Sequence, residues 1–412
     1  MTGGAEGPAL RATAILDRDP PRALGLAVSG GGDSVAMLHL LAPAARARGI
    51  GLHAATVDHG LRPEARDEAR RVARACAALG VPHDILEWTG WDGRGNLQDA
   101  ARRARRALLT DWAAKRGLDA VALGHTRDDQ AETVLMRLAR GSGVDGLAAM
   151  AIERREAGLR WLRPLLGIGR AELRDWLTGQ GIGWDEDPSN EDRGFQRVRA
   201  RDALAALAPL GLEVDGLVAT AERMAMARAA LDALAAELSS RALRLVAGAV
   251  AVDLAAYRAA PEETRLRLAA AALRWIGGGA YRPRLVPLRA ALEGAAEGRR
   301  RTLAGVTLRA ARGTLWLCRE PKAVEGPVAP DTPWDGRWQV SGPGGAVRLA
   351  ALGAEGLRQC PGWRDLGLPR DALLPTPALW DGARLVAAPC AGRAEGWRAR
   401  IVADFPYPTL PH

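Results

Sequence analysis

The segment Ser29-Gly-Gly-Gly-Asp-Ser34 holds the residue types best suited to chemistry. It follows an apolar run over 24–28 that is typical of a buried parallel strand, and an apolar-periodic helix begins directly after it, at Val35. Glycines let backbone N–H groups approach an anion closely, and a helix N-terminus adds its dipole. The segment therefore predicts a phosphate-binding loop, with a glycine-rich turn that binds nothing as the alternative.

The carboxylate of Asp33 distinguishes this loop from a simple anion site, because a carboxylate repels phosphate. Its presence is explained if a Mg²⁺ ion lies between the carboxylate and the phosphate. The loop lacks the Gly-Lys-Ser/Thr ending of a Walker A motif and does not match GxGxxG, so neither of those nucleotide sites is predicted.

Polar residues also follow two other predicted strands. Asp58, His59 and Arg62 come after the run 51–57, and His125 comes after the run 120–124. Because ligands bind beyond the carboxyl ends of parallel strands, we expect these residues near the glycine loop. For Asp58, an ordinary capped turn is the alternative.

Three carboxylates follow His125 at the start of a predicted helix: Asp128, Asp129 and Glu132. Their spacings of three and four residues place them on one face of its first turn. Aspartates are common helix caps, but three carboxylates and a histidine exceed what capping needs. The cluster is therefore interpreted as functional.

A third strand is predicted over 81–87, and the next helix is predicted to begin at Asn96. Arg102, Arg105 and Arg106 share one face of that helix. A guanidinium on this face can stabilise phosphate charge, and a solvated basic face is the alternative.

Basic residues recur after the turn at 184–190. Arg197, Arg199 and Arg201 alternate with other residues and follow Phe195, which favours contact with nucleic acid. The net charge of +9 over 412 residues suits an anionic partner. A solvated stripe in a chain with a general bias towards arginine is the alternative.

The four cysteines, Cys76, Cys318, Cys360 and Cys390, show neither metal-binding spacing nor a disulfide framework. The N-terminal segment does not resemble a signal peptide, and no apolar run approaches the length of a membrane span. These features predict a reduced, cytoplasmic setting without membrane attachment.

The chain is long enough for two or three domains. Alternating strands and helices predict a doubly wound parallel α/β domain over residues 1–214, with a helix over 170–180 near its end. We expect an alanine-rich helical domain over 215–300 and a strand-rich domain over 301–412. Within them the predicted elements are helices over 217–243, 262–276 and 287–297 and a hairpin from 302–309 and 314–318.

Five motifs stand in order along residues 22–205: SGGGDS, DHGLR, NLQDAAR, GHTRDDQAET and DPSN followed by arginines. In combination they resemble the tRNA(Ile)-lysidine synthetase family of the PP-loop ATP-pyrophosphatase superfamily. LARGSG at 138–143 and RPLL at 163–166 resemble further segments of that family. The resemblance implies a PP-loop fold that uses ATP and Mg²⁺.

The resemblance also implies a two-step ligase reaction. ATP adenylates O2 of the wobble cytidine in an isoleucine tRNA with a CAU anticodon, and pyrophosphate leaves. The ε-amine of free L-lysine then displaces AMP, so that lysidine forms and the anticodon reads AUA instead of AUG. The helical and strand-rich domains would contact the tRNA. The sequence does not determine the oligomeric state, and a homodimer is kept open.

By the same resemblance, Asp33 would face Mg²⁺ and Arg105 would stabilise charge on the α-phosphate. His125, Asp129 and Glu132 would bind the lysine ε-ammonium, whose unperturbed pKa is about 10.4, and one of them would deprotonate it. The predicted ATP-binding residues are Ser29, Gly30, Gly31, Gly32, Asp33, Ser34, Asp58 and Gly124. The predicted tRNA contacts are Arg197, Arg199 and Arg201.

Two positions depart from the family pattern. Arg106 stands where an aromatic residue is common, and Val198 replaces the asparagine of an Arg-Asn-Arg tail. Three other interpretations stay open: a sulfur-transferring tRNA thiolase, which usually needs cysteines; an amide-forming PP-loop enzyme, which would not need the basic tail; and a non-catalytic nucleic-acid-binding protein.

Overall fold

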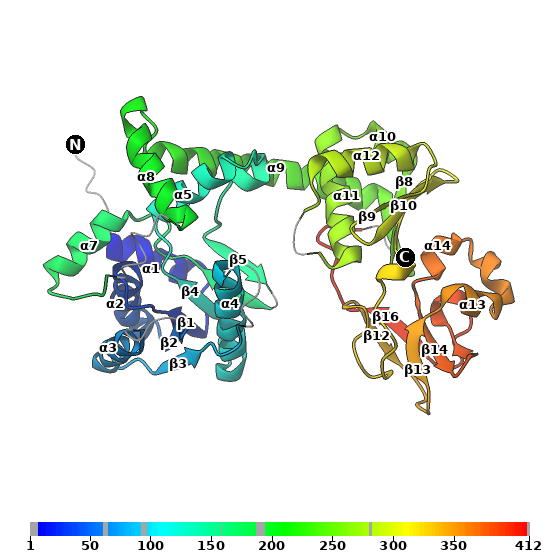
Figure 1. Ribbon diagram of the computed structural model, residues 1–412, viewed down its shortest axis with the longest axis horizontal. Helices are drawn as coiled ribbons and strands as arrows, with labels where there is room; N and C mark the ends of the chain where they lie inside the picture. The colour runs from blue at the N-terminus through cyan, green and yellow to red at the C-terminus, as the bar shows by residue number, and fades with distance from the viewer. Residues whose placement is uncertain are drawn as a thin grey trace. The chain divides into compact units, whose positions relative to one another are not determined.

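The computed structural model describes residues 7–60, 65–91, 97–156, 158–186, 194–279 and 282–409. The chain forms two compact units, Met1–Arg228 and Ala229–His412, and helix α9 (Val214–Ala242) runs across the division (Figure 1). Each unit is described by itself below.

A six-stranded sheet forms the centre of the first unit, in the order β3-β2-β1-β4-β6-β5. Its neighbouring strands are parallel except for the hairpin pair β5 and β6. The strands are β1 (Ala23–Ala27), β2 (Gly51–Asp58), β3 (His83–Glu87), β4 (Ala120–Leu123), β5 (Glu153–Glu156) and β6 (Leu159–Leu162). The four predicted parallel strands are confirmed, whereas the hairpin was not predicted, because the charged edge strand β5 reads Glu-Arg-Arg-Glu.

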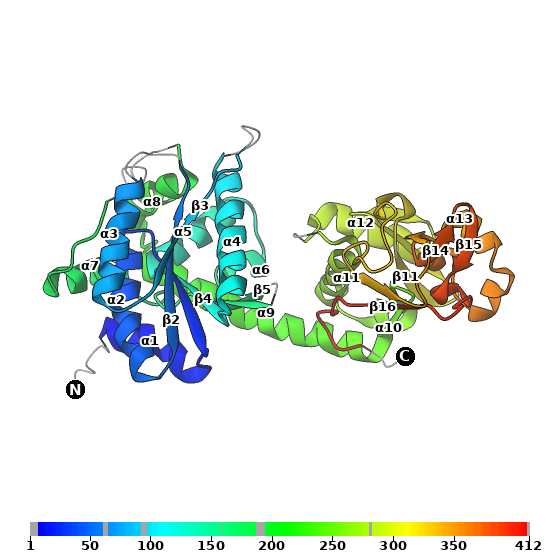
Figure 2. The ribbon, with the colours of Figure 1, turned by 90° about the horizontal axis from the view of Figure 1, so that it is seen from below.

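Helices cover both faces of this sheet, which confirms the doubly wound fold (Figure 2). Leu24 and Leu26 of β1 share a buried core with α1, α2, α3 and α7, while the opposite face packs on α4. A Cβ at Gly25 would lie 2.6 Å from Cζ3 of Trp112, so glycine lets α4 approach closely. The helices are α1 (Pro8–Arg18), α2 (Gly32–Ala47), α3 (Ala65–Ala78), α4 (Leu97–Arg116), α5 (Arg127–Leu138), α6 (Val144–Leu147), α7 (Arg170–Gly179) and α8 (Gln196–Leu207).

The strand order reverses between β1 and β4. The chain passes from β1 outward to β2 and β3, then returns to the other side of β1 to form β4. Ligands of open α/β sheets bind at such a switch point, beyond the carboxyl ends of the strands. The glycine loop follows β1 and His125 follows β4, so this topology brings the two motifs to the same crevice.

The second unit contains a five-stranded antiparallel sheet, in the order β7-β8-β11-β10-β9, and two smaller sheets. The strands are β7 (Leu243–Val246), β8 (Ala249–Asp253), β9 (Arg301–Leu303), β10 (Val306–Ala311), β11 (Thr314–Arg319), β12 (Trp338–Ser341), β13 (Arg348–Ala351), β14 (Pro377–Asp381), β15 (Arg384–Ala387) and β16 (Arg398–Ile401). Its helices, besides the end of α9, are α10 (Leu254–Ala259), α11 (Glu262–Gly277), α12 (Leu285–Ala296), α13 (Gly353–Arg358) and α14 (Arg370–Leu373).

The predicted helices over 262–276 and 287–297 correspond to α11 and α12. The strand predicted over 302–309 is instead broken into β9 and β10, because Ala304 and Gly305 turn the chain with positive φ angles of 51° and 72°. Strands from both sides of residue 300 share one sheet, and the predicted domain boundaries at 214 and 300 stay predictions.

No single helix among the described residues is both long and apolar enough to cross a membrane, although the bent pair Gln196–Leu210 and Val214–Ala242 passes that test jointly.

Candidate active site

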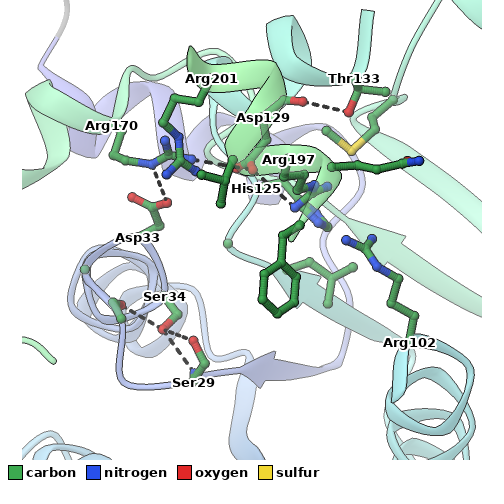
Figure 3. Close-up of a pocket in the computed structure, with 18 of the residues that line it drawn as sticks. Ser29, Asp33, Ser34, Arg102, His125, Asp129, Thr133, Arg170, Arg197 and Arg201 are labelled. Carbon is green, nitrogen blue, oxygen red and sulfur yellow. Dashed lines mark hydrogen bonds and ion pairs between the residues drawn. The ribbon is translucent and has the colours of Figure 1, made fainter. Parts of the chain in front are cut away.

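A cavity of about 760 Å³ opens beside the glycine loop in the first unit (Figure 3). Segments that lie far apart in the sequence contribute to its wall, including the loop after β1, the start of α5, and helices α4, α7 and α8. The predicted residues that line it are Ser29, Gly31, Gly32, Asp33, Ser34, Arg105, Gly124, His125, Asp129, Arg197 and Arg201. Gly30, Asp58, Glu132 and Arg199 are not among its lining residues.

The glycine loop is held by its own two serines. The Ser34 hydroxyl donates to the carbonyl of Gly31 at 2.9 Å and accepts from the backbone N–H of Ser29 at 3.1 Å. Gly30 has a φ of +93°, a conformation that glycine adopts without strain. The loop therefore has a fixed shape before any anion binds.

A second segment, Trp184–Asp185, packs against the outside of the loop. The backbone N–H of Asp185 donates to the carbonyl of Gly30 at 2.9 Å, and the Asp185 carboxylate accepts from Arg71 Nε at 2.8 Å. The sequence predicts only a turn here. The segment lies 150 residues beyond the loop, and local composition carries no signal of that contact.

Gly124 follows β4 directly and packs against the start of the loop helix α2. A Cβ at this position would lie 3.2 Å from Ser34 Cα and 3.3 Å from the Asp33 carbonyl oxygen. Both neighbours are backbone atoms, so a side chain here would displace the start of α2. Gly124 therefore shapes the site through close packing.

Asp129 combines a capping role with a place in the cavity. Its Oδ2 accepts from the backbone N–H of Thr126 at 2.8 Å and completes a capping box at the start of α5. Its Oδ1 lies 3.4 Å from Arg197 Nη1 and 3.6 Å from Arg170 Nη2. Although burial acts in the opposite direction, Arg197, His125, Thr126 and Arg170 together hold the pKa of Asp129 below its ordinary value.

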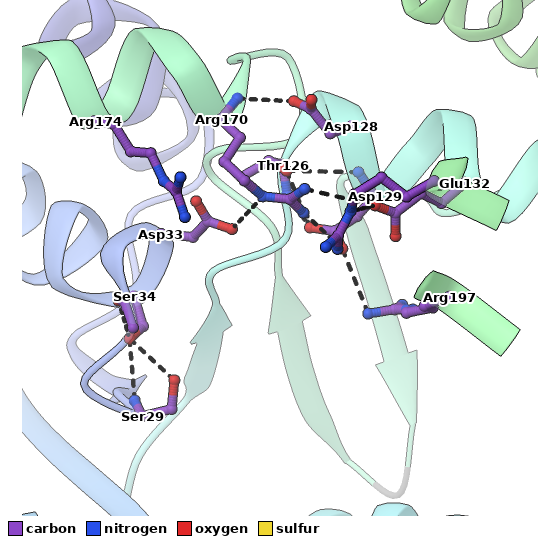
Figure 4. Close-up of polar contacts among 12 residues, drawn as sticks. Ser29, Asp33, Ser34, Thr126, Asp128, Asp129, Glu132, Arg170, Arg174 and Arg197 are labelled. Carbon is purple, nitrogen blue, oxygen red and sulfur yellow. Dashed lines mark hydrogen bonds and ion pairs between the residues drawn. The ribbon is translucent and has the colours of Figure 1, made fainter. Parts of the chain in front are cut away.

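Arg170 is the functional side chain that the sequence did not reveal. It begins α7, lies mostly buried, and donates from Nε to Asp33 Oδ2 at 3.2 Å (Figure 4). Burial raises the pKa of Asp33 despite the opposing effect of Arg170. Because burial disfavours the charged carboxylate, a further cation beside Asp33 would stabilise it.

Three neighbouring arginines form a basic wall of the cavity: Arg102, Arg105 and Arg197. Burial lowers the pKa of Arg105, and the neighbouring charges of Arg102 and Arg197 lower it further. Arg197 pairs with Asp129, whereas neither Arg102 nor Arg105 has an ion pair among the described residues, so this wall is suited to bind an anion. Arg106 turns away, stacks 4.2 Å from the Trp161 ring centroid and pairs with Glu156. Trp161 thus supplies the partner for Arg106, the position at which the family commonly has an aromatic residue.

His125 lines the cavity as a neutral imidazole. Burial lowers its pKa to about 3. The charge of Asp129 acts in the opposite direction, and the charges of Arg197, Arg163 and Arg105 offset part of that effect. Its Nδ1 is buried and has no hydrogen-bond partner among the described residues. That nitrogen therefore has unused hydrogen-bonding capacity in this structure.

Glu132 lies behind the cavity wall, with a side chain only 1% exposed. Its Oε1 accepts from Arg201 Nε at 3.1 Å and faces Arg170 Nη1 at 3.5 Å. Burial, together with the charge of Asp129, raises the pKa of Glu132 despite these arginines. The predicted carboxylate cage is thus already paired with guanidinium groups.

Helix geometry divides the three arginines predicted to bind tRNA. They lie on α8, where residues four apart share a face, and Arg197 and Arg201 both point into the cavity. Arg199 lies on another face, where its Nη1 donates to the carbonyl of Gly194 at 3.4 Å. The alternation seen in the sequence therefore does not correspond to one continuous contact surface.

Some predicted residues have other surroundings or lie outside the described part of the chain. Asp58 is buried at the end of β2, where its Oδ1 accepts from the backbone N–H of Gly60 at 2.8 Å, as in a capped turn. Its role at the ATP site stays a prediction. Arg62, Asn96, the segment 187–190 and Arg193 lie outside the described residues.

The cavity offers few protein ligands for Mg²⁺. Among the residues described, no three or more His, Cys, Asp or Glu side chains form a group that could hold a metal ion. Mg²⁺ at nucleotide sites needs only one or two carboxylates, because phosphates and water supply the other oxygens. Asp33, a partly buried carboxylate that lines the cavity, fits one such ligand.

Comparison with known proteins identifies the family of this chain. A family model described as a PP-loop domain matches residues 8–208. The tRNA(Ile)-lysidine synthase of Ruegeria pomeroyi is 48% identical over 419 aligned residues, which cover 100% of both chains. This chain belongs to the tRNA(Ile)-lysidine synthase family. A Bradyrhizobium family member is 44% identical over 71% of this chain and 84% of its own, and the Rhizobium meliloti member is 36% identical over 91% and 86%.

Membership of the lysidine synthase family confirms the resemblance given by the five motifs. The family's PP-loop domain covers every predicted site residue. The individual roles of those residues are proposals, developed below.

Proposed function

We propose that this chain is an ATP-dependent ligase that joins L-lysine to the wobble cytidine of an isoleucine tRNA with a CAU anticodon. The observation that carries the proposal is the arrangement of a single cavity. A phosphate-binding loop and an arginine wall lie in the same cavity as a carboxylate beside a neutral histidine. Such a cavity can bind a nucleotide and an amine together.

In the first step, O2 of the cytidine attacks the α-phosphorus of ATP. The bond from that phosphorus to the bridging oxygen breaks, and pyrophosphate leaves with the bonding electrons. Arg105, supported by Arg102 and Arg197, stabilises the negative charge that develops on the α-phosphate. A bound Mg²⁺, with Asp33 as its protein ligand, supplies further neutralisation of the phosphates.

In the second step, the ε-nitrogen of lysine attacks C2 of the cytosine ring, and the C2–O bond breaks so that AMP leaves. The amine must first lose a proton from its ammonium form. Asp129, whose pKa is lowered, is suited to hold the ammonium. Burial, with a smaller contribution from nearby arginines, lowers the pKa of His125, and a bound phosphate would offset the arginines so that the neutral imidazole could accept the proton.

Basic residues that do not line the cavity bind the tRNA. They include Arg199 on α8 and arginines of the second unit. Free lysine as the amine, a homodimer and a cytoplasmic location belong to the same proposal. The family membership supports tRNA(Ile) as the substrate.

The sulfur-transferring alternative is not favoured by the cysteines. Reactive thiols have lowered pKa values. Here burial raises the pKa of Cys76 to about 11 and that of Cys390 to about 12, and it also raises the pKa values of Cys318 and Cys360. None of the four lines the cavity.

The test is incorporation of labelled lysine. Purified protein receives ATP, Mg²⁺ and labelled lysine with either an isoleucine tRNA or a methionine tRNA that has the same CAU anticodon. We expect stable label in the isoleucine tRNA alone. Pyrophosphate release without label would keep the adenylation step and contradict lysine as the nucleophile.

A further inference from the structure

Arg170 lies where the first turns of two helices meet. Its backbone N–H donates to Asp128 Oδ2 at 2.7 Å, and the backbone N–H of Arg127 donates to the Ile168 carbonyl at 3.0 Å. These bonds join the start of α7 to the start of α5. The backbone of both helices therefore fixes the position from which the Arg170 side chain extends. The sequence predicts only a helix start there.

The Arg170 guanidinium presents a different nitrogen to each of three carboxylates (Figure 4). Nε lies 3.2 Å from Asp33 Oδ2, Nη2 lies 3.6 Å from Asp129 Oδ1, and Nη1 lies 3.5 Å from Glu132 Oε1. Asp33 comes from α2, whereas Asp129 and Glu132 come from α5. A guanidinium spreads its donors over three nitrogens in one rigid plane, whereas a lysine ammonium presents all three donors from a single nitrogen.

The contacts of the neighbouring cations differ from those of Arg170. Arg197 pairs with Asp129, and Arg201 pairs with Glu132, so each of these carboxylates keeps a cation if Arg170 is removed. Among the described residues, no other ion pair reaches Asp33. Arg170 is therefore the side chain that links the nucleotide loop to the amine-side carboxylates.

We propose that Arg170 is a positioning residue that couples the nucleotide side of the cavity to its amine side, by holding Asp33, Asp129 and Glu132 in one cluster. The inference rests on the proposed function. A cation that binds Asp33 and an ammonium that binds Asp129 would both lie beside carboxylates whose positions the same guanidinium fixes. Arg170 therefore sets the affinity for lysine while it touches none of the reacting atoms.

The charged and titratable groups that face Arg170 come from three helices and the loop before α5. They are Asp33 of α2, Asp128, Asp129 and Glu132 of α5, Arg197 and Arg201 of α8, and His125. Loss of Arg170 leaves four carboxylates facing two arginines. We expect Asp33 and Asp129 to move apart and the ammonium site to lose its shape.

The experiment compares Arg170→Met with Glu172→Gln. Glu172 lies on the same helix, outside the cavity lining, and pairs with Arg11 of α1. Pyrophosphate release without lysine reports adenylation, and label incorporation against lysine concentration reports the second step. For Arg170→Met we expect the KM for lysine to rise at least about tenfold, the loss of one or more charge-assisted hydrogen bonds. The Glu172→Gln enzyme is expected to keep the wild-type KM.

Chemical rescue separates positioning from folding. Free guanidinium ion, added far below denaturing concentrations, is expected to restore part of the lysine KM of Arg170→Met and to leave the wild type unchanged. A lysine KM equal to that of Glu172→Gln would overturn the inference. If Arg170→Met does not fold, Arg170→Lys decides, since a lysine keeps the charge but not the fork: an unchanged lysine KM overturns the inference and a raised one supports it. Absence of label from the wild type would instead reject the proposed function.

Discussion

At the scale of single residues, the cavity is defined by unequal charge balance. Asp33 is a partly buried carboxylate whose one ion pair among the described residues is with Arg170, so its negative charge is incompletely compensated. The clustered guanidinium groups of Arg102, Arg105 and Arg197 outnumber the one carboxylate, Asp129, that pairs with them. Both deficits are met when an anion and its cation bind together. The local electrostatics therefore favour a nucleotide with its metal over either alone.

Asp33→Asn is expected to slow the first step, the adenylation of the tRNA. The amide keeps the shape of the side chain but not its charge, so the cation would lose its protein ligand. We expect tRNA-dependent pyrophosphate release to fall about 10²–10³-fold, the cost of losing one preorganised electrostatic group. Release within a few-fold of the wild type would contradict the role given to Asp33.

Glu132→Gln is expected to separate stability from activity. The folded-state pKa of Glu132 is raised above its unfolded value, so the folded protein holds this proton more tightly than the unfolded chain. Stability is therefore lost as pH rises from the ordinary range of glutamate through the raised folded value. At pH 7 the neutral amide should unfold about 2–4 °C above the wild type.

Thermal unfolding of Glu132→Gln at several pH values tests that sign. The difference in melting temperature should vanish below the ordinary pKa range of glutamate, where both side chains are neutral. The same variant should lose lysine incorporation more than pyrophosphate release. A lower melting temperature at pH 7 would show that the ion pairs with Arg170 and Arg201 outweigh the burial of the charge.

At the scale of elements, helix geometry places neighbouring arginines on different faces and so gives them different roles. On α8, Arg197 faces the cavity and Arg199 lies on another face. We expect Arg197→Ala to lower the rate of the chemical steps about tenfold or more. Arg199→Ala should mainly raise the KM for tRNA. Steady-state kinetics of the two variants decide this, and equal effects on both constants would reject the division.

The close contact of Gly124, after β4, with the start of α2 predicts the effect of a single added methyl group. Gly124→Ala places a Cβ against the backbone of Asp33 and Ser34, and overpacking of this kind costs about 1–3 kcal/mol. The displaced loop should raise the KM for ATP severalfold. Gly179→Ala, in the last turn of α7 with no atom within 4 Å of the added Cβ, is the matched control.

At the scale of the whole molecule, basic charge supports binding of tRNA. The chain has a net charge of +9, and a protein that neutralises phosphates releases their counterions. We therefore expect the logarithm of tRNA affinity to fall linearly with the logarithm of salt concentration, with a slope of about −0.7 to −0.9 for each phosphate contacted. Filter binding of tRNA at a series of salt concentrations measures the slope. A slope near zero would contradict an interface based on phosphate contacts.

Short-range patterns in the sequence determined much of this protein. The glycine loop between strand and helix, the carboxylates at the start of α5 and the arginine face of α4 depend on residues within one or two helical turns of each other. Their local geometry is the same in any fold that contains them. For this reason the parallel strands and the glycine loop are found where the sequence predicts them, and many of the predicted site residues line one cavity.

Tertiary structure decided which of these groups meet. Arg170 and Asp33 stand 137 positions apart, and Asp185 stands 155 positions from Gly30, to whose carbonyl it donates. Such contacts depend on how α7 packs against α2 and α5, and no local spacing encodes them. The same packing buried Glu132 behind its arginines and left Asp129 at the cavity surface, because burial and charge pairing are properties of the assembled fold.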